Sequence, residues 1–530
     1  MAPSSLVKLT ALHFIAGKLC MTQKNNKKQQ RKTFVFHPLL FGCLPILALV
    51  AYNIKQLDFL HTVRSIVVTL LVSIFVFILS VLLLRDRHKG GLLASLTLIL
   101  VFTYGHVYDL LENGSLLGHH RLLVLIWLAI FVLGMLGIVK LKTKLDKLST
   151  IFNLVSVLMA AVPIFLIIKA EISPRQTPAT NPSLDEIWQP ASSPAGSPDV
   201  YFIVLDSYAR SDMLETYHHY DNSAFVQSLQ RMGFYVADCS KSNYSNTPSS
   251  IASTLNMDYL DQFAAKTIRN NQHLYDLGET IKYSKTAQQF GSLGYQFITF
   301  ETNTWWLDIT HSDQFISQST TQWQKLLDFR FVSDFEQHYL HTTALRLVDE
   351  FLNTRQNQNT KGELSIEKAR YDQVLHGIDQ LDQLPATSNP KFVYLHLMAP
   401  TSPYVFSSDG SFQYTPANAP GYVDEIEYLN QRVLQSVRQI ISRSDTPPVI
   451  LIEGDHGLNP EVQNANLMAF YLPDDGDQAL YPTITSVNSF RIVFNKYFDA
   501  DYPLLEDIAY SSAYQTPFDF EIVDYPCAVE

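Results

Sequence analysis

The sequence predicts an amino-terminal bundle of about five transmembrane helices followed by an α/β domain with a mostly parallel central sheet. Three observations support this fold class. Apolar runs of about 20 residues, the length that spans a bilayer, fill the region from 36 to 170. A proline-rich stretch follows at 171–198. From residue 199 onward, short apolar runs alternate with helical sequence, which is typical of a parallel sheet covered by helices.

The apolar runs are long enough to cross a hydrocarbon core about 30 Å thick as helices. They lack the polar face that core helices of a soluble protein show, so we interpret them as membrane spans. We place them at Phe36–Tyr52, Ser65–Leu84, Gly91–Leu110, Leu122–Val139 and Thr150–Ile168.

The short loops between these runs predict the orientation. Lysine and arginine gather in Lys24–Lys32, Arg85–Lys89 and Lys140–Lys147, whereas the other two loops carry few positive charges. The positive-inside rule places the three basic segments in the cytoplasm. We therefore expect a multi-pass protein of the plasma (inner) membrane, with residues 1–35 cytoplasmic, 36–170 transmembrane, 171–198 a linker and 199–530 extracytoplasmic.

Composition excludes some functions for the last of these regions. The net charge of −11 is contributed mostly by this region, whereas the basic residues of the membrane region lie in short clusters. Nucleic-acid binding needs a concentrated basic surface, so we expect none. Cys239 and Cys527 belong to this region and could pair in an oxidising compartment, but the sequence does not show that they meet.

The α/β domain opens with Asp199–Asp206, an apolar run ending in a carboxylate that is typical of a buried central strand. Helical sequence is expected near Asn222–Met232 and Tyr422–Ser442. Further strands are expected at Gly233–Ala237, Tyr295–Phe300, Phe392–Met398, Val449–Glu453 and Leu467–Leu472. Ligand sites of such sheets lie beyond the carboxyl ends of the strands, where Asp206 and Asp455 fall.

Two local patterns suggest a metal-dependent site. The strand at Val449–Glu453 leads into Gly454-Asp455-His456-Gly457, and aspartate with histidine suits Zn²⁺ or Mn²⁺. Taken alone, such a turn more often has a structural role. In the second pattern, a polar loop leads into Pro248 at the start of a helix, which places the Thr247 hydroxyl in the positive field of the helix terminus. The alternative is that Asn246 or Thr247 only caps this helix.

Taken together, these residues resemble the metal site of the alkaline-phosphatase/sulfatase superfamily. Thr247 follows Asp206 by 41 residues, and Asn246–Ser250 is similar to the sulfatase Cys-x-Pro-Ser-Arg signature with threonine as nucleophile. Threonine cannot form the sulfatase aldehyde, but it is the nucleophile of lipoteichoic-acid synthases and lipid phosphoethanolamine transferases, which also carry five transmembrane helices. The resemblance implies an alkaline-phosphatase-like domain and one divalent ion (Zn²⁺, Mn²⁺ or Mg²⁺) on Asp206, Thr247, Asp455 and His456.

The resemblance also extends to Phe392–Tyr404, where the family has a strand followed by a histidine-containing loop. His396 is retained, but Thr401 and Ser402 stand where relatives often carry a second histidine. We therefore place His396 at the catalytic site and His396, Thr401 and Arg491 at the substrate. The alternatives are a buried structural role for His396 and pairing of Arg491 with a structural partner.

Three functions remain open at this point. The first is a phosphotransferase or phosphohydrolase that uses the Thr247 nucleophile on a lipid-linked or cell-envelope phospho-substrate. The second is a sulfatase-like hydrolase of soluble phosphate esters, for which the membrane part is only an anchor. The third is a non-catalytic domain that binds an envelope component, an alternative supported by the missing second histidine.

Overall fold

The computed structural model describes most of the chain. Described are residues 33–54, 59–112, 120–142, 144–172, 196–260, 273–318, 334–347, 366–384, 390–416, 419–458, 462–512, 518–524 and 527. The predicted basic segment at 24–32 and most of the predicted linker, residues 173–195, lie outside these ranges.

Five helices form the amino-terminal part, as the sequence predicts. They are α2 (His37–Asn53), α3 (Phe59–Leu84), α4 (Arg87–Glu112), α5 (His120–Lys140) and α6 (Leu145–Ile172). Four of them are long and apolar enough to cross a membrane. α2 has 17 residues, which corresponds to about 25 Å of helix and makes it the shortest of the five.

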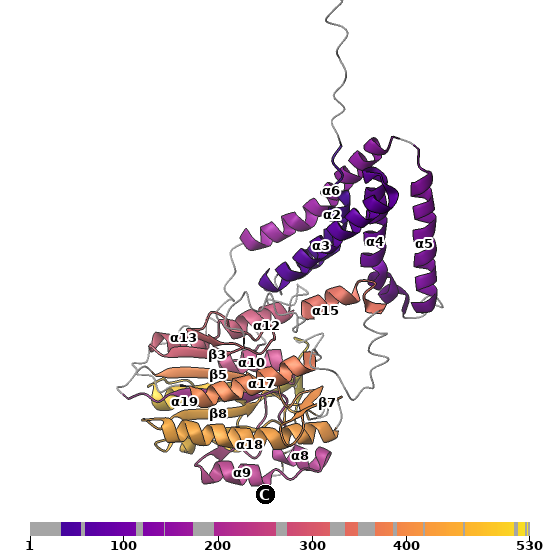
Figure 1. The fold of residues 1–530 in the computed structure, drawn as a ribbon. Helices are drawn as coiled ribbons and strands as arrows, with labels where there is room; N and C mark the ends of the chain where they lie inside the picture. Colours follow the sequence, from indigo (N-terminus) through magenta and orange to yellow (C-terminus); the bar gives the residue numbers. More distant parts are fainter. Residues whose placement is uncertain are drawn as a thin grey trace, which may run out of the picture. The chain divides into compact units, whose positions relative to one another are not determined.

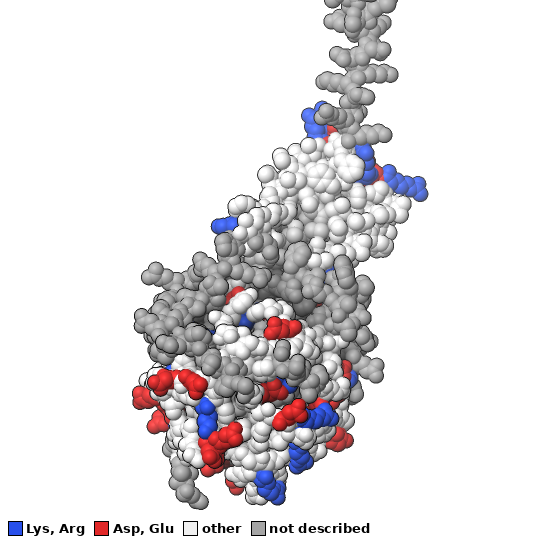
Figure 2. Space-filling model, turned by 90° about the vertical axis from the view of Figure 1, so that its left-hand side faces the viewer, with Lys and Arg blue, Asp and Glu red and all other residues white. Residues whose placement is uncertain are grey.

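The surface of these helices matches a hydrocarbon environment. Large apolar side chains such as Leu83 (67% exposed), Leu133 (69%) and Phe165 (64%) face outward along α3, α5 and α6. Figure 2 shows this surface almost free of charge, with Lys and Arg gathered mainly near one end. Because the segments 85–89 and 140–147 join α3 to α4 and α5 to α6, these basic residues lie at helix ends. An apolar exterior of this size is typical of a membrane protein.

The α/β part is built on a seven-stranded sheet with the order β2-β9-β8-β1-β5-β3-β4. Its strands are β1 (Val200–Leu205), β2 (Tyr235–Val236), β3 (Gln296–Phe300), β4 (Gln314–Ile316), β5 (Lys391–Leu397), β8 (Val449–Gly454) and β9 (Met468–Tyr471). The pairs β1–β5, β1–β8, β3–β5 and β3–β4 are parallel, and β8–β9 and β2–β9 are antiparallel. The sheet is therefore mostly parallel, as expected.

Both faces of the sheet are covered, which explains why its central strands read as continuous apolar runs. On one face, Phe202 of β1 packs among residues of α10 (Thr247–Asn256), α12 (His273–Lys282), α13 (Lys285–Ser292) and α19 (Ser486–Tyr497). On the other face, Ile203 packs among residues of α8 (Ser211–His218), α9 (Ser223–Arg231), α17 (Ile366–Gln383) and α18 (Ala419–Arg443). Figure 1 shows α17 and α18 lying across this second face.

The remaining elements are short. They comprise α15 (Asp334–His341), the 3₁₀ turn η2 (Gly476–Ala479) and two hairpins, β6 (Tyr404–Phe406) with β7 (Phe412–Thr415) and β10 (Ala509–Ser511) with β11 (Glu521–Val523). A disulfide joins Cys239 to Cys527, with their Cα atoms 5.6 Å apart. The possibility that the sequence left open is thereby decided in favour of pairing.

Candidate metal centre

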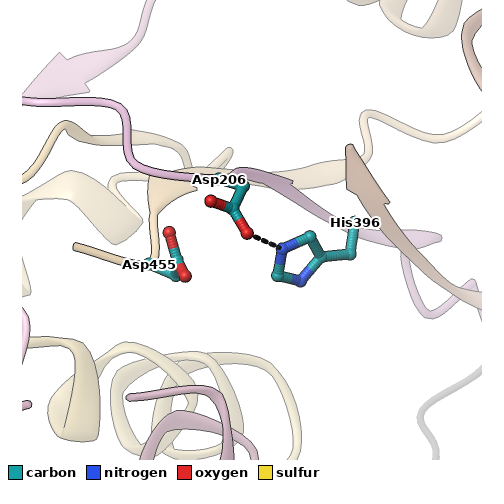
Figure 3. Close-up of side chains that lie close together, drawn as sticks. All are labelled: Asp206, His396 and Asp455. Atoms are coloured by element: carbon teal, nitrogen blue, oxygen red, sulfur yellow. Dashed lines mark hydrogen bonds and ion pairs between the residues drawn. The ribbon is translucent and has the colours of Figure 1, made fainter. Parts of the chain in front are cut away.

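Three buried side chains from neighbouring strands meet at the carboxyl-terminal edge of the sheet. Asp206 follows β1, His396 lies in β5 and Asp455 follows β8, and one potential ligand atom from each falls within 4.8 Å of the other two. Figure 3 shows the His396 ring directed at the Asp206 carboxylate, with Asp455 on the other side of Asp206. The two atoms His396 Nε2 and Asp206 Oδ2 are 3.4 Å apart. The strand order β8-β1-β5 makes this convergence a direct result of the sheet topology.

The glycines of the Gly454–Gly457 turn allow the backbone to fold closely around Asp455. A Cβ atom at Gly454 would lie 2.2 Å from the carbonyl oxygen of Tyr208, and one at Gly457 would lie 2.7 Å from that of Ala465. Any larger side chain at either position would force the backbone apart. Packing therefore requires the two glycines of the Gly-Asp-His-Gly turn, which carries Asp455.

Ser207 connects the two aspartates. Its φ of 64° is uncommon for a residue other than glycine. Its backbone N–H donates to Asp455 Oδ1 at 2.8 Å, and its hydroxyl donates to Asp206 Oδ1 at 2.9 Å. One oxygen of each carboxylate is thereby held by the protein. Asp455 Oδ2 is buried and has no hydrogen-bond partner among the described residues.

The start of α10 brings Thr247 to the same edge. Asn246 is the N-cap, because its side chain accepts a hydrogen bond from the Ser249 N–H at 3.1 Å. Pro248 occupies the first turn, as the sequence predicts. Ser250 donates to the carbonyl oxygen of Asp455 at 2.6 Å, which fixes the helix against the turn after β8. Since Asn246 performs the capping, the Thr247 hydroxyl remains available for other contacts.

His456 lies between Thr247 and Asp455. Its Nε2 atom is 3.3 Å from the Thr247 hydroxyl oxygen and 3.6 Å from Asp455 Oδ2. Those two oxygens are consequently no more than about 7 Å apart. The His456 Nδ1 atom lies 2.6 Å from the Gly457 carbonyl oxygen, to which it donates, so in the neutral ring the lone pair is on Nε2. Thr247 and His456 are half-buried, whereas Asp206, His396 and Asp455 are buried, so a ligand meets Thr247 and His456 first.

The charged side chains at this site change one another's pKa values. Burial alone would raise the pKa of Asp206, but hydrogen bonding and the charges of His396 and His456 outweigh it and lower the pKa to about 2. Burial raises the pKa of Asp455, and repulsion from Asp206 acts in the same direction against the attraction of His456. Burial would lower the pKa of His456, but the two carboxylates raise it. A cation placed between two buried carboxylates this close together would offset their mutual repulsion.

The residues fit a divalent metal ion. Two carboxylates, an imidazole nitrogen with a free lone pair and a hydroxyl are a donor set that Zn²⁺, Mn²⁺ or Mg²⁺ can accept. The Asp455 oxygen without a partner is the clearest structural sign, since a buried carboxylate oxygen is costly without a donor or cation. The sequence named Asp206, Thr247, Asp455 and His456 as ligands, and the structure brings all four together.

The structure places His396 deeper than a residue that contacts substrate directly. It is buried in β5, where its Nδ1 atom lies 3.2 Å from the Tyr394 hydroxyl while Nε2 faces Asp206. Thr401 lies at the same edge, because the Ser207 hydroxyl is 3.5 Å from its hydroxyl oxygen. His396 and Thr401 thus both adjoin the Asp206 side of the group.

Arg491 has a different position. Its guanidinium donates to the carbonyl oxygen of Met257 at 2.8 and 2.6 Å and to that of Pro503 at 2.6 Å. Met257 is the C-cap of α10, whose first residue is Thr247. Ten helical residues separate the two ends by about 15 Å. The structure therefore gives Arg491 backbone contacts at the far end of α10 and does not bring it to the metal group.

Sequence reasoning missed three contributors. Ser207 holds both Asp206 and Asp455, Ser250 holds the Asp455 backbone and Tyr394 contacts His396. Ser207 and Tyr394 could have been noticed from their spacing, one residue after Asp206 and two before His396 on the same face of a strand. Ser250 carried no signal of its own beyond its place in the first turn of α10.

Comparison with family models and with curated proteins finds no match for this sequence. Among solved structures, it is similar to proteins of the alkaline phosphatase superfamily, including one from Vibrio parahaemolyticus (10% identity, 61% of this chain and 75% of that one, TM-score 0.34). The others include two phosphoethanolamine transferases. The C-terminal periplasmic domain of EcEptC from Escherichia coli is 11% identical, with 64% of this chain and 96% of that one covered and a TM-score of 0.40. The integral membrane protein lipooligosaccharide phosphoethanolamine transferase A from Neisseria meningitidis is 13% identical, with 87% and 94% covered and a TM-score of 0.35.

Proposed function

We propose that this protein is a membrane-anchored, metal-dependent phosphotransferase or phosphohydrolase that uses Thr247 as its nucleophile. The observation that supports it best is the position of the Thr247 hydroxyl, 3.3 Å from His456 Nε2 at the amino terminus of α10. The same nitrogen is 3.6 Å from the Asp455 oxygen that has no hydrogen-bond partner among the described residues. The Thr247 hydroxyl, the His456 imidazole and the Asp455 carboxylate thus lie close to one another and to Asp206.

The proposed chemistry assigns a role to each of these residues. Asp206, Asp455, His456 and Thr247 would hold one divalent ion, which lowers the pKa of a hydroxyl and neutralises phosphoryl charge when bound. The Thr247 hydroxyl loses its proton and its oxygen attacks phosphorus, while the bond from phosphorus to the donor oxygen breaks and the donor leaves with a proton. The amino terminus of α10 favours the negative charge that develops on the Thr247 oxygen. Water or an acceptor alcohol then attacks the phosphothreonine and releases Thr247.

The substrate we propose is lipid-linked or belongs to the cell envelope. The helices with apolar exteriors would hold the α/β part close to lipid headgroups. We place that part on the extracytoplasmic side of the membrane, because the basic loops at 85–89 and 140–147 favour a cytoplasmic location for their helix ends. The Cys239–Cys527 disulfide supports this side, since disulfides persist in oxidising compartments. His396 and Thr401 would support the Asp206 side of the site, with His396 holding the carboxylate in place.

The test uses the full chain in detergent with phospholipids carrying ³²P in the headgroup. Label should become covalently attached to the wild-type protein and not to Thr247→Ala. Thr254→Ala, which removes a hydroxyl from the same helix, is the matched control and should label normally. Label that passes to a second lipid identifies a transferase, whereas label that appears only as water-soluble phosphate identifies a hydrolase.

Metal analysis completes the test. The wild-type protein should bind about one divalent ion, and Asp455→Asn should bind at least tenfold more weakly, because one ligand is lost. Covalent labelling that persists in Thr247→Ala would rule out this nucleophile. A wild-type protein that binds metal but turns over neither lipid nor soluble phosphate esters would instead favour a non-catalytic binding domain.

A further inference from the structure

Arg370 lies beside the candidate metal centre, and no motif in the sequence points to it. It belongs to the amino-terminal part of α17, the helix that packs against β5, β6 and β7. Its Nη1 atom lies 3.4 Å from the carbonyl oxygen of Ser402. Ser402 follows Thr401, whose hydroxyl is 3.5 Å from that of Ser207. A short chain of contacts therefore leads from Arg370 to the residue that holds Asp206 and Asp455.

Two other nitrogens of the Arg370 guanidinium have no hydrogen-bond partner among the described residues. Its Nε and Nη2 atoms are buried and make no hydrogen bond with any described residue. Arg210 pairs with Asp212 at 2.7 Å, and Arg432 pairs with Asp379 at 2.7 Å although its Nε also lacks a hydrogen-bond partner among the described residues. A buried guanidinium with two unused nitrogens is costly, because donors removed from water need acceptors in return.

The charges around Arg370 explain why it is not neutralised by the protein. Burial lowers its pKa, while the charges of Glu425, Asp206 and Glu367 raise it. Glu425 is the first of these, but burial raises its own pKa to about 8, so near neutral pH this carboxyl group is mostly protonated. Its Oε1 atom accepts from the backbone N–H groups of Val405 and, at 3.2 Å, Phe406. Glu425 thus holds the loop that passes Arg370, and no ion pair joins it to the guanidinium among the described residues.

We propose that Arg370 binds an anionic oxygen of the group that is transferred at Thr247. The proposal rests on the proposed function and identifies the residue that recognises the charge of its substrate. A guanidinium fits phosphate oxygens with two parallel N–H groups, and Nε and Nη2 form such an edge. The two aspartates would balance a divalent ion, so the positive charge of Arg370 remains available to the substrate. It would supply this charge on the side of the loop where Thr401 and Ser402 replace a histidine.

The experiment measures binding of inorganic [³²P]phosphate to the full chain in detergent by equilibrium dialysis, with Mn²⁺ content determined in the same samples. Arg370→Gln should weaken phosphate binding roughly ten- to a hundredfold, which is the range for losing a charge-assisted pair. Arg370→Lys keeps the charge but loses the paired N–H groups, so its loss should be several-fold smaller. Mn²⁺ content should stay at the wild-type value in both variants. Arg443→Gln, at an exposed arginine of α18, is the matched control and should bind phosphate normally.

Each remaining outcome is informative. Wild-type phosphate affinity in Arg370→Gln would overturn the proposal, and so would a parallel loss of Mn²⁺, which would show that Arg370 only supports the fold. If Arg370→Gln fails to fold, the Lys variant decides, because unchanged phosphate affinity there would also refute paired recognition. Failure of the proposed function looks different. In that case Thr247→Ala keeps full turnover. The effect of the Arg370 variants on phosphate binding can still be measured by equilibrium dialysis.

Discussion

The pH dependence of stability can be tested at Glu425, a buried acid on α18 that is not one of the candidate metal ligands. Its pKa in the folded protein is about 8, against 4.5 for the ordinary carboxyl group. The folded state therefore holds one more proton than the unfolded state between these values. Linkage then requires that the stability contributed by this group is complete below about pH 4.5 and is lost as pH rises toward 8.

The size of the effect follows from the two pKa values. The difference of about 3.5 between the two pKa values corresponds to a loss of about 5 kcal/mol in stability over the whole pH range between them. Between pH 6 and pH 8 alone, the group should cost the folded state about 2 kcal/mol, because it is only half ionised at pH 8. For an α/β part of roughly 330 residues, the unfolding entropy converts this into a change in Tm of about 3 °C.

The substitution that tests this reasoning is Glu425→Gln, which keeps the oxygen that accepts from Val405 and Phe406 and removes the ionisation. We expect the Tm of wild type minus that of the variant to fall by about 3 °C between pH 6 and pH 8, measured by intrinsic fluorescence in detergent. Glu427→Gln, two residues along the same helix, is the matched control for replacing a carboxylate on α18. A wild-type advantage that stays level or grows with pH would refute the assignment of a raised pKa.

Three further outcomes are expected. Cys239→Ser together with Cys527→Ser removes a link that closes 288 residues, for which loop entropy gives about 6 kcal/mol, so the Tm of the double variant should fall to that of reduced wild type. Asn246→Ala should lower the free energy of unfolding by about 1 kcal/mol in a denaturant titration, because α10 loses its cap, and a change below 0.3 kcal/mol would show that the cap is dispensable. Mn²⁺ at 100 times its Kd should stabilise wild type by about 2.7 kcal/mol and Asp455→Asn hardly at all, and the affinity for Mn²⁺ should rise with pH, because a proton competes for Asp455, whose pKa is raised. An affinity that falls with pH would contradict this.

Much of the fold could be predicted because burial on both faces leaves a clear pattern. Val200–Leu205 and Val449–Ile452 are continuous apolar runs, and both belong to central strands. The strand β4 at Gln314–Ile316 was missed, since three residues at a sheet edge carry no recognisable period. The cysteines could be named but not paired, because whether two distant Cα atoms approach within bonding distance depends on the whole tertiary structure.

The candidate site was predictable where a residue directly follows a strand. Asp206 and Asp455 are such residues, and sheet topology alone brings them together. Arg491 shows the limit of this reasoning, since nothing in its neighbourhood along the chain indicates that its partners are the carbonyl groups of Met257 and Pro503. Arg370 shows the same limit for a residue that the sequence did not indicate at all. Its proximity to Ser402 arises from helix packing, which local sequence does not encode.

The place of β1 in the sheet has a consequence for how the protein is made. β1 is synthesised before every other strand of the sheet, yet its neighbours on the two sides are β5, which begins at Lys391, and β8, which begins at Val449. A nascent chain that has reached residue 390 therefore exposes Val200–Leu205 with both edges unpaired. Such an apolar segment readily joins other chains. We expect that this stretch must be shielded during biogenesis until about 250 further residues have been added.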